Sequence, residues 1–128
     1  MTGSKFVIVH FYHKDFERCK IVDMHLREIA KQHTEAKFVY LNAENSPFFI
    51  QKLQIKVLPT IIAFIDGIAT DRVVGFEELG NRDDFPRLML TRRLIRTGAI
   101  RALNKTEAGS IKIKKRGGRE DSDGEDSS

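Results

Sequence analysis

Residues 5–42 read KFVIVHFYHKDFERCKIVDMHLREIAKQHTEAKFVYLN, and this stretch decides the fold. Its first part, Lys5–Tyr12, is β-branched, aromatic and almost continuously apolar, which is typical of a strand buried on both faces. Residues 20–33 carry apolar side chains at three- and four-residue steps and predict a helix. Residues 37–42 (KFVYLN) predict a second strand. A strand, a helix and a strand joined by short links form a βαβ unit, so the two strands should be parallel with a right-handed crossover.

The second half of the chain contains further short segments of both kinds. Ser46 can cap a short helix that has Pro47 in its first position. The turn signal Asp66-Gly67 separates two further strands and predicts a hairpin. Gly98 is a suitable stop for a last helix. The expected elements are a short helix from Ser46, strands at 59–65 and 71–75, and a helix at 81–97.

Composition predicts one soluble domain followed by a tail. The chain has 128 residues, of which 41% are hydrophobic and 31% charged, and a net charge of +4. We expect the domain at residues 1–104 and a disordered charged tail at residues 105–128. Residues 112–119 are basic and residues 120–126 are acidic, and such a segment buries too little apolar surface to offset its ordering entropy. No apolar run is long enough for a transmembrane span, so no membrane contact is expected.

Cys19 is the one cysteine of the sequence, which excludes an internal disulfide. A lone cysteine fits the reducing cytoplasm or nucleus better than the secretory route. The short apolar run after Lys5 also lacks the small-residue cleavage site of a signal peptide. We therefore expect a cytoplasmic protein that can also be nuclear.

The predicted last helix concentrates positive charge. One interpretation is that these cations lie near a helix C-terminus, where the helix dipole favours them. The other is a basic patch that binds an acidic protein partner. The candidate partner-binding residues are Arg87, Arg92, Arg93 and Arg96.

Three segments resemble the thioredoxin fold. HFYHKDFERCK (10–20) resembles the strand-to-helix junction that carries that family's Cys-x-x-Cys, IKVLPT (55–60) its cis-proline loop, and FIDGIATDRVVGF (64–76) its hairpin. Their order over about residues 5–97 implies a thioredoxin-like α/β fold, with a central mixed sheet flanked by helices and without the usual first strand and helix. The resemblance also implies that Pro59 is cis.

Departures from the thioredoxin pattern imply that the chain is not a dithiol enzyme. In the place of Cys-x-x-Cys it has Phe16-Glu17-Arg18-Cys19. Family catalysis needs a thiolate at the first position, where a helix N-terminus lowers its pKa, and Phe16 has no thiol. Cys19 falls at the second, resolving position, which alone can neither make the first attack nor close an internal disulfide. His10 stands where the family has a buried acid.

Within this superfamily the chain resembles the phosducin-like group. The likeness rests on HFY, F-x-R-C-K, I-K-V-x-P-T and the segment VVGFEELGNRDDF, and it is dense over residues 7–85. It implies a redox-inactive protein without a cofactor that binds other proteins, with residues 16–18 and Pro59 lining a contact surface. It further implies a co-chaperone that regulates a cytosolic chaperonin, with the chaperonin or its actin and tubulin clients as partners.

The group also has an N-terminal helical segment and thioredoxin a first strand, neither of which is recognisable here, so we expect a truncated form. In thioredoxin the first strand pairs with the strand that corresponds to residues 37–42. That strand should therefore be an edge with open hydrogen-bonding groups. A partner could cover it, or a second copy could do so in a homodimer.

Three other functions stay open on sequence grounds. Cys19 could serve a monothiol redox protein, although a lone buried cysteine is usually inert. Residues 112–119 could bind nucleic acid, but a solvated tail is favoured because the adjacent acidic run competes for the same basic groups. A metal site is disfavoured because the spacing of its candidate ligands matches no standard finger; the competing interpretation is a partly buried His10 with the other histidines solvated. The candidate ligands are His10, His13, Cys19, His25 and His33.

Overall fold

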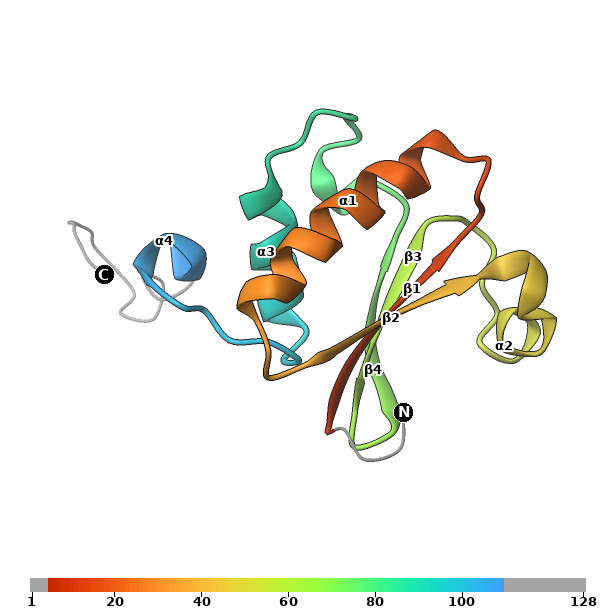
Figure 1. Cartoon of the computed structure of the whole chain (residues 1–128), viewed down its shortest axis with the longest axis horizontal. Helices are drawn as coiled ribbons and strands as arrows, with labels where there is room; N and C mark the ends of the chain where they lie inside the picture. The colour runs from red at the N-terminus through yellow and green to blue at the C-terminus, as the bar shows by residue number, and fades with distance from the viewer. Residues whose placement is uncertain (1–4, 110–128) are drawn as a thin grey trace.

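A computed structural model describes residues 5–109 of the chain (Figure 1). Its strands are β1 (Phe6–Tyr12), β2 (Lys37–Asn42), β3 (Thr60–Ile65) and β4 (Ile68–Val74). Its helices are α1 (Glu17–Gln32), α2 (Pro47–Lys52), α3 (Arg87–Arg96) and α4 (Lys105–Ala108), with short 3₁₀ turns η1 (Ala43–Asn45) and η2 (Glu77–Leu79). Within the described range no helix combines the length and apolarity needed to cross a membrane.

The four strands form one mixed sheet in the order β2-β1-β3-β4. β1 and β2 are parallel, with Val9 opposite Val39, which confirms the predicted βαβ unit. β3 is antiparallel to both β1 and β4, and a bulge between Ala63 and Phe64 shifts the register of the hairpin. β2 lies at one edge of the sheet, as the sequence predicted.

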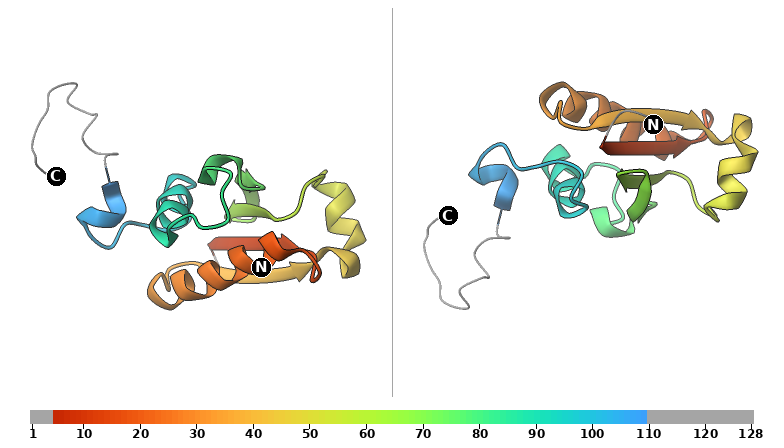
Figure 2. Two further views of the ribbon diagram at one scale, coloured as in Figure 1. Left: turned by 90° about the horizontal axis from the view of Figure 1, so that it is seen from above. Right: turned by 90° about the horizontal axis from the view of Figure 1, so that it is seen from below.

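β1 is buried on both faces because its alternate residues enter two separate cores. Ile8 joins the larger core, in which Leu26 of α1 and Leu90 of α3 cover one face of the sheet. Val9 joins the smaller core on the other face, where Ile55 follows α2. Figure 2 shows that α2 lies at one end of the molecule, whereas α4 lies beyond α3 at the other.

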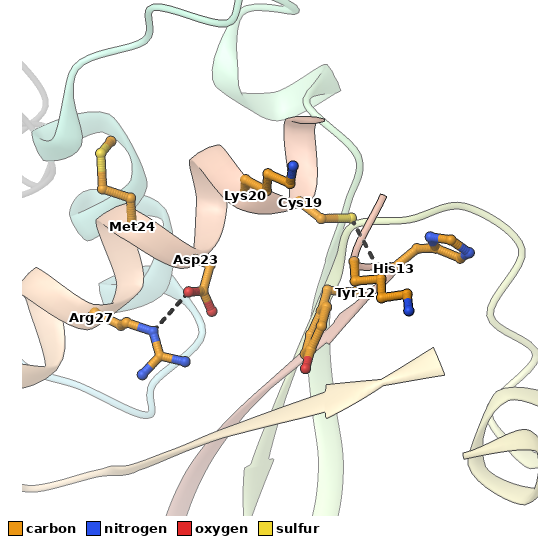
Figure 3. A pocket seen from close by; sticks show the side chains of 8 residues that line it. Tyr12, His13, Cys19, Lys20, Asp23, Met24 and Arg27 are labelled. Atoms are coloured by element: carbon orange, nitrogen blue, oxygen red, sulfur yellow. Dashed lines mark hydrogen bonds and ion pairs between the residues drawn. The ribbon is translucent and has the colours of Figure 1, made fainter. Parts of the chain in front are cut away.

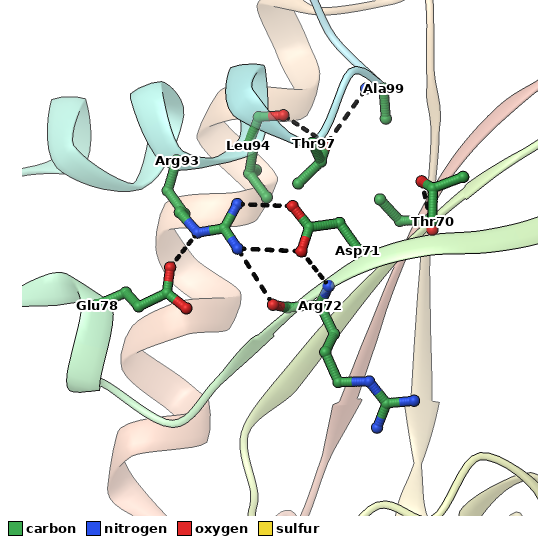
Figure 4. A network of polar contacts seen from close by, with 9 residues as sticks. Thr70, Asp71, Arg72, Glu78, Arg93, Leu94, Thr97 and Ala99 are labelled. Atoms are coloured by element: carbon green, nitrogen blue, oxygen red, sulfur yellow. Dashed lines mark hydrogen bonds and ion pairs between the residues drawn. The ribbon is translucent and has the colours of Figure 1, made fainter.

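An ion-pair cluster around a buried arginine joins α3 to β4 (Figure 4). The Arg93 guanidinium donates to both carboxylate oxygens of Asp71 at 3.1 and 3.2 Å, to the Arg72 carbonyl oxygen at 3.2 Å, and to Glu78. Only 7% of the Arg93 side chain is exposed. The hydrogen bond from Arg93 lowers the pKa of the Asp71 carboxyl, so the carboxylate stays ionised opposite its partner.

Several predicted boundaries are wrong in position. α1 begins at Glu17 rather than residue 20, and β4 begins at Ile68 rather than Asp71. α3 begins at Arg87 rather than residue 81, because Pro86 is its N-cap and a residue that precedes proline is disfavoured in helical conformation. Pro47 does occupy the first turn of α2, but Ser46 makes no side-chain capping bond.

The prediction that the chain is disordered from residue 105 onward is wrong for residues 105–108. Residues 105–108 form α4, and the Asn104 side chain accepts from the Glu107 N–H and caps it. Arg92 on α3 donates to the Thr106 carbonyl oxygen at 2.6 and 3.1 Å and holds α4 against α3. The basic and acidic blocks at 112–119 and 120–126 lie outside the described residues.

Replacing Arg93 by alanine should destabilise the domain by about 2–4 kcal/mol, because it leaves the Arg72 carbonyl oxygen without its Arg93 donor and removes the ion pair from Asp71, which keeps the hydrogen bond from the Arg72 N–H. Arg96→Ala is the matched control, since Arg96 is exposed on the same helix, and its effect should stay within about 0.5 kcal/mol. Urea unfolding followed by circular dichroism measures both. Equal effects of the two substitutions would contradict the structural role of Arg93.

Candidate functional site

The junction between β1 and α1 presents Phe16 at the surface. Phe16 is extended (φ −95°, ψ 122°), and its carbonyl oxygen accepts from the N–H groups of Cys19 at 3.1 Å and Lys20 at 3.3 Å. The helix therefore starts at Glu17, whose exposed carboxylate lies in the first turn. The Phe16 ring is 45% exposed and stacks on His13 with 4.4 Å between ring centroids.

A groove of about 280 Å³ opens beside the proline loop, lined by Arg18, residues 57–59, residues 74–77 and Asn81. The Leu58–Pro59 peptide bond is cis, as the resemblance implied. The Pro59 carbonyl oxygen accepts from the Gly75 N–H at 2.8 Å, which ties the loop to the end of the hairpin. Val57 and Val74 remain 46% and 38% exposed, so the groove offers fixed apolar side chains to solvent.

Arg18 forms the charged wall of this groove. Its guanidinium lies 4.5 Å from the centroid of the Phe76 ring, a cation–π contact. It also donates to Asp83 at 2.8 Å and to the Asn81 carbonyl oxygen at 3.3 Å. These contacts connect the first turn of α1 to the loop before α3 and hold one cation in place beside apolar surface.

Cys19 lies away from this groove, at the mouth of a second hollow of about 240 Å³ (Figure 3). Cys19, Asp23 and Arg27 follow one another at four-residue steps along α1, and all three line the hollow. The thiol is buried, with the residue 2% exposed, and its sulfur accepts from the His13 N–H at 3.5 Å. Burial raises the pKa of Cys19, so little thiolate is available near neutral pH.

His10 lies beneath α1 and is 0% exposed, not partly buried as expected. Desolvation lowers its pKa to about 4, although Asp23 opposes this with a carboxylate oxygen 3.8 Å from His10 Nδ1. Neither ring nitrogen has a hydrogen-bond partner among the described residues. The rings of Tyr12 and Tyr40 lie beside the His10 ring, with 5.7 and 6.3 Å between the ring centroids.

The prediction that the remaining histidines are solvated is wrong for two of them. His25 is buried against Phe85 and accepts from Arg87 at 3.1 Å. The two ring nitrogens of His33 lie 3.3 Å from Glu35 and 3.1 Å from Glu107, so this buried ring joins α1 to α4. Across residues 5–109 no three His, Cys, Asp or Glu side chains are grouped so that they could hold a metal ion.

The four candidate arginines do not form one surface. Arg93 does not contribute to the predicted basic patch, because its buried guanidinium is bound to Asp71 and Glu78. Arg92 is half-buried and bound to α4, whereas Arg87 and Arg96 are exposed. Only the latter two therefore offer positive charge freely to a partner.

Of the residues predicted to line one contact surface, Arg18 and Pro59 both line the groove, whereas Phe16 and Glu17 do not. Sequence reasoning also missed residues that line the two hollows. Val57 and Val74 line the groove. They could have been recognised in the sequence as apolar residues, one beside the proline of the loop and the other at the end of the hairpin. Asp23 was also missed, although its spacing of four residues from Cys19 puts both on one helix face.

The family model described as Thioredoxin matches residues 1–85. The chain belongs to the thioredoxin family. In fold it is similar to the thioredoxin of Plasmodium falciparum, with a TM-score of 0.61 at 21% identity over 74% of this chain and 83% of that one.

Two curated relatives are much closer in sequence. Phosducin-like protein 3 of Drosophila melanogaster is 52% identical over 94 residues, which cover 73% of this chain and 44% of that protein. Thioredoxin domain-containing protein 9 of Mus musculus is 50% identical over 91 residues, or 71% of this chain and 40% of that protein. In sequence this thioredoxin-family chain is thus similar to these relatives, and it spans less than half the length of either.

Native Cys19 should react with a thiol reagent at pH 7 at least roughly tenfold more slowly than Cys19 in the unfolded chain, because burial withholds the thiolate. Ellman's reagent with and without denaturant measures the two rates. A Met24→Cys, Cys19→Ser variant is the control, since Met24 is 51% exposed on the same helix and its replacement should react rapidly. Fast reaction of native Cys19 would support a monothiol redox role.

His10 should make the fold less stable in acid. Its pKa of about 4 in the folded chain lies below the ordinary value of 6.5, so only the unfolded state takes up a proton between these two pH values. The stabilisation is complete above pH 6.5 and is lost as the pH falls towards 4, by roughly 3 kcal/mol in total. Urea unfolding at a series of pH values measures this loss.

His10→Leu should flatten the same curve, while the control His13→Gln should keep it because His10 is intact. The acid sensitivity that remains in His10→Leu should come from groups such as His25, whose pKa burial also lowers. A curve for His10→Leu that is parallel to the parent curve would rule out His10 as the cause.

Proposed function

We propose that this chain is a non-catalytic thioredoxin-like protein that binds protein partners through the groove beside Pro59 and regulates folding by a cytosolic chaperonin. The observation that carries the proposal is the combination of an open groove with exposed valines and a charged wall at the proline loop, and a lone, buried thiol that lines a different hollow. The site is thus built for contact rather than for electron transfer.

Electron balance disfavours dithiol chemistry in this chain. Reduction of a substrate disulfide requires two thiols to supply two electrons and become a disulfide themselves. The sequence holds one cysteine, and by the resemblance of the motifs Phe16 stands at the position from which the family's first thiolate attacks. The raised pKa of Cys19 disfavours the monothiol alternative as well.

The groove suits an extended segment that carries apolar side chains and one acidic residue. Val57 and Val74 provide partly exposed apolar surface, and hot spots at interfaces commonly form where such groups are desolvated on binding. Arg18 is already held by Phe76 and Asp83, so it loses little side-chain entropy when it pairs with a carboxylate. Exposed Arg87 and Arg96 are proposed as a second contact with an acidic surface.

A chaperonin as the partner, with actin and tubulin as its clients, is proposed from the family resemblance of the motifs alone. We propose that the chain acts in the cytosol, with access to the nucleus. Neither nucleic acid nor a membrane is needed for this role.

Val57→Glu should reduce capture of chaperonin subunits from cytosol by the immobilised chain at least about tenfold, because it puts a negative charge in the place of an apolar side chain of the groove. Ile68→Glu is the matched control: Ile68 is 66% exposed at the far end of the hairpin, and its replacement should leave capture unchanged. Quantitative mass spectrometry of the captured proteins measures both, after circular dichroism shows that both variants are folded. Undiminished capture by Val57→Glu would exclude the groove, and no capture by the parent chain would exclude the chaperonin role.

A further inference from the structure

The segment that contains α4 is attached to the rest of the protein mainly by polar groups. Within the described range, no residue from 101 to 108 belongs to either apolar core, and Leu103 is 52% exposed. The contacts that hold the segment join polar groups: Arg92 with Thr106, His33 with Glu107, and Glu35 with the Arg101 N–H. A segment with few buried apolar contacts opens more readily than the core.

The His33 ring lies between two carboxylates, although only 1% of the residue is exposed. Its Nδ1 is 3.3 Å from Glu35 Oε2, and its Nε2 is 3.1 Å from Glu107 Oε1. Within the described part of the chain Nε2 makes no directional hydrogen bond, so charge is what attracts it to Glu107. Ionised carboxylates only accept, and a neutral imidazole has hydrogen on one nitrogen only. Both contacts are therefore favourable only when the ring is protonated on both nitrogens.

The surroundings of His33 favour this protonated form. Its two nearest charges are the carboxylates, whereas Arg87 donates to His25 and Arg92 donates to a backbone carbonyl oxygen. The charged residues on the elements packed against it are Glu28 on α1, Glu35 in the turn after α1, Arg87 and Arg92 on α3, and Arg101, Lys105 and Glu107 in the α4 segment.

We propose that α4 is a pH-sensitive strap, which is closed on α1 and α3 while His33 is protonated and is released when the ring loses its proton. The closed form needs the proton, whereas release leaves His33 as an ordinary histidine that titrates near about pH 6.5. Closure is therefore strongest from about pH 5 to about pH 6.5, and it weakens above that by at most about tenfold per pH unit.

The strap also controls the exposure of a positive charge. The Arg92 side chain passes so close to Gly109 that a Cβ added there would lie 2.6 Å from Arg92 Nε. Arg92 and Arg96 are four residues apart on α3 and share a face, but only Arg96 is exposed in the closed form. Release of α4 adds Arg92 to this face. On the proposed function, closed α4 thus inhibits the second contact, the one with an acidic surface.

Relaxation of the ¹³Cα nuclei of residues 105–108 in the full chain measures the strap and is independent of amide exchange. Order parameters should be near about 0.85 at pH 6 and fall below about 0.6 at pH 8, together with the titration of the His33 ring signals. Those of α1 should stay near about 0.85 at both pH values.

Glu107→Gln keeps an acceptor for the Leu103 N–H but removes the charge opposite His33, so α4 should be mobile at both pH values. Glu28→Gln is the matched control, because it makes the same change in the same hollow at a carboxylate that pairs with Lys31. It should keep the transition. His33→Gln should abolish the transition if circular dichroism shows that this variant is folded, and if it is not, Glu107→Gln decides.

An α4 that is equally ordered at pH 6 and pH 8, or equally mobile, would overturn the proposal. A transition that survives in Glu107→Gln or is lost in Glu28→Gln would also overturn it.

The exposure of Arg92 is tested with a peptide of about ten glutamates at low salt. The parent chain should bind it at least about threefold more tightly at pH 8 than at pH 6, and Arg92→Ala should abolish this gain. Without release the affinity would stay constant, or would fall as histidines lose their charge, and either result would overturn the control of Arg92 by the strap. No chaperonin takes part, so failure here is distinguishable from failure of chaperonin capture.

Discussion

The burial of β1 on both faces is the constraint on which the rest of the structure depends. Residues 7–11 are all buried, and their alternation divides the apolar groups of the chain between the core under α1 and α3 and the core on the α2 side. With β1 fixed at the centre, the crossover through α1 sets β2 parallel on one side, and the hairpin fills the other. The carboxyl end of β1 then leads directly into the exposed Phe16 and the start of α1.

The same constraint explains why the sheet could be predicted and the helix limits could not. A run such as FVIVHFY has one reasonable interpretation, because so many adjacent apolar groups require cover on both sides. Helix limits depend on local competition instead. The segment 81–86 has helix-compatible residues, but buried Phe85 precedes Pro86, and Asn81 adopts a positive φ of 57°. Packing and the proline therefore move the start of α3 to Arg87, and the apolar periodicity of the sequence does not reveal this limit.

The candidate site was accessible from sequence only where residues are neighbours in the chain or belong to a recognised motif. Arg18 and Pro59 were found in this way. The burial of Arg93 was not, because its partners Asp71 and Glu78 come from β4 and η2 and are brought to it by the hairpin. The arginines of α3 thus have three different roles: Arg93 is a buried ion-pair partner, Arg92 binds α4, and Arg96 is exposed. Only tertiary contacts distinguish these roles.

The start of α1 shows how the field of a helix N-terminus acts in this chain. Unpaired N–H groups and the helix dipole make a helix N-terminus favourable for negative charge, which in a dithiol enzyme stabilises the attacking thiolate. Here the negative charge in the first turn is the Glu17 carboxylate, so the same field stabilises the helix itself. Phe16, with no charge to stabilise, is free to present its ring to solvent beside His13. The local electrostatics thus stabilise the start of the helix, and the residue before it leaves an aromatic ring partly exposed at the surface.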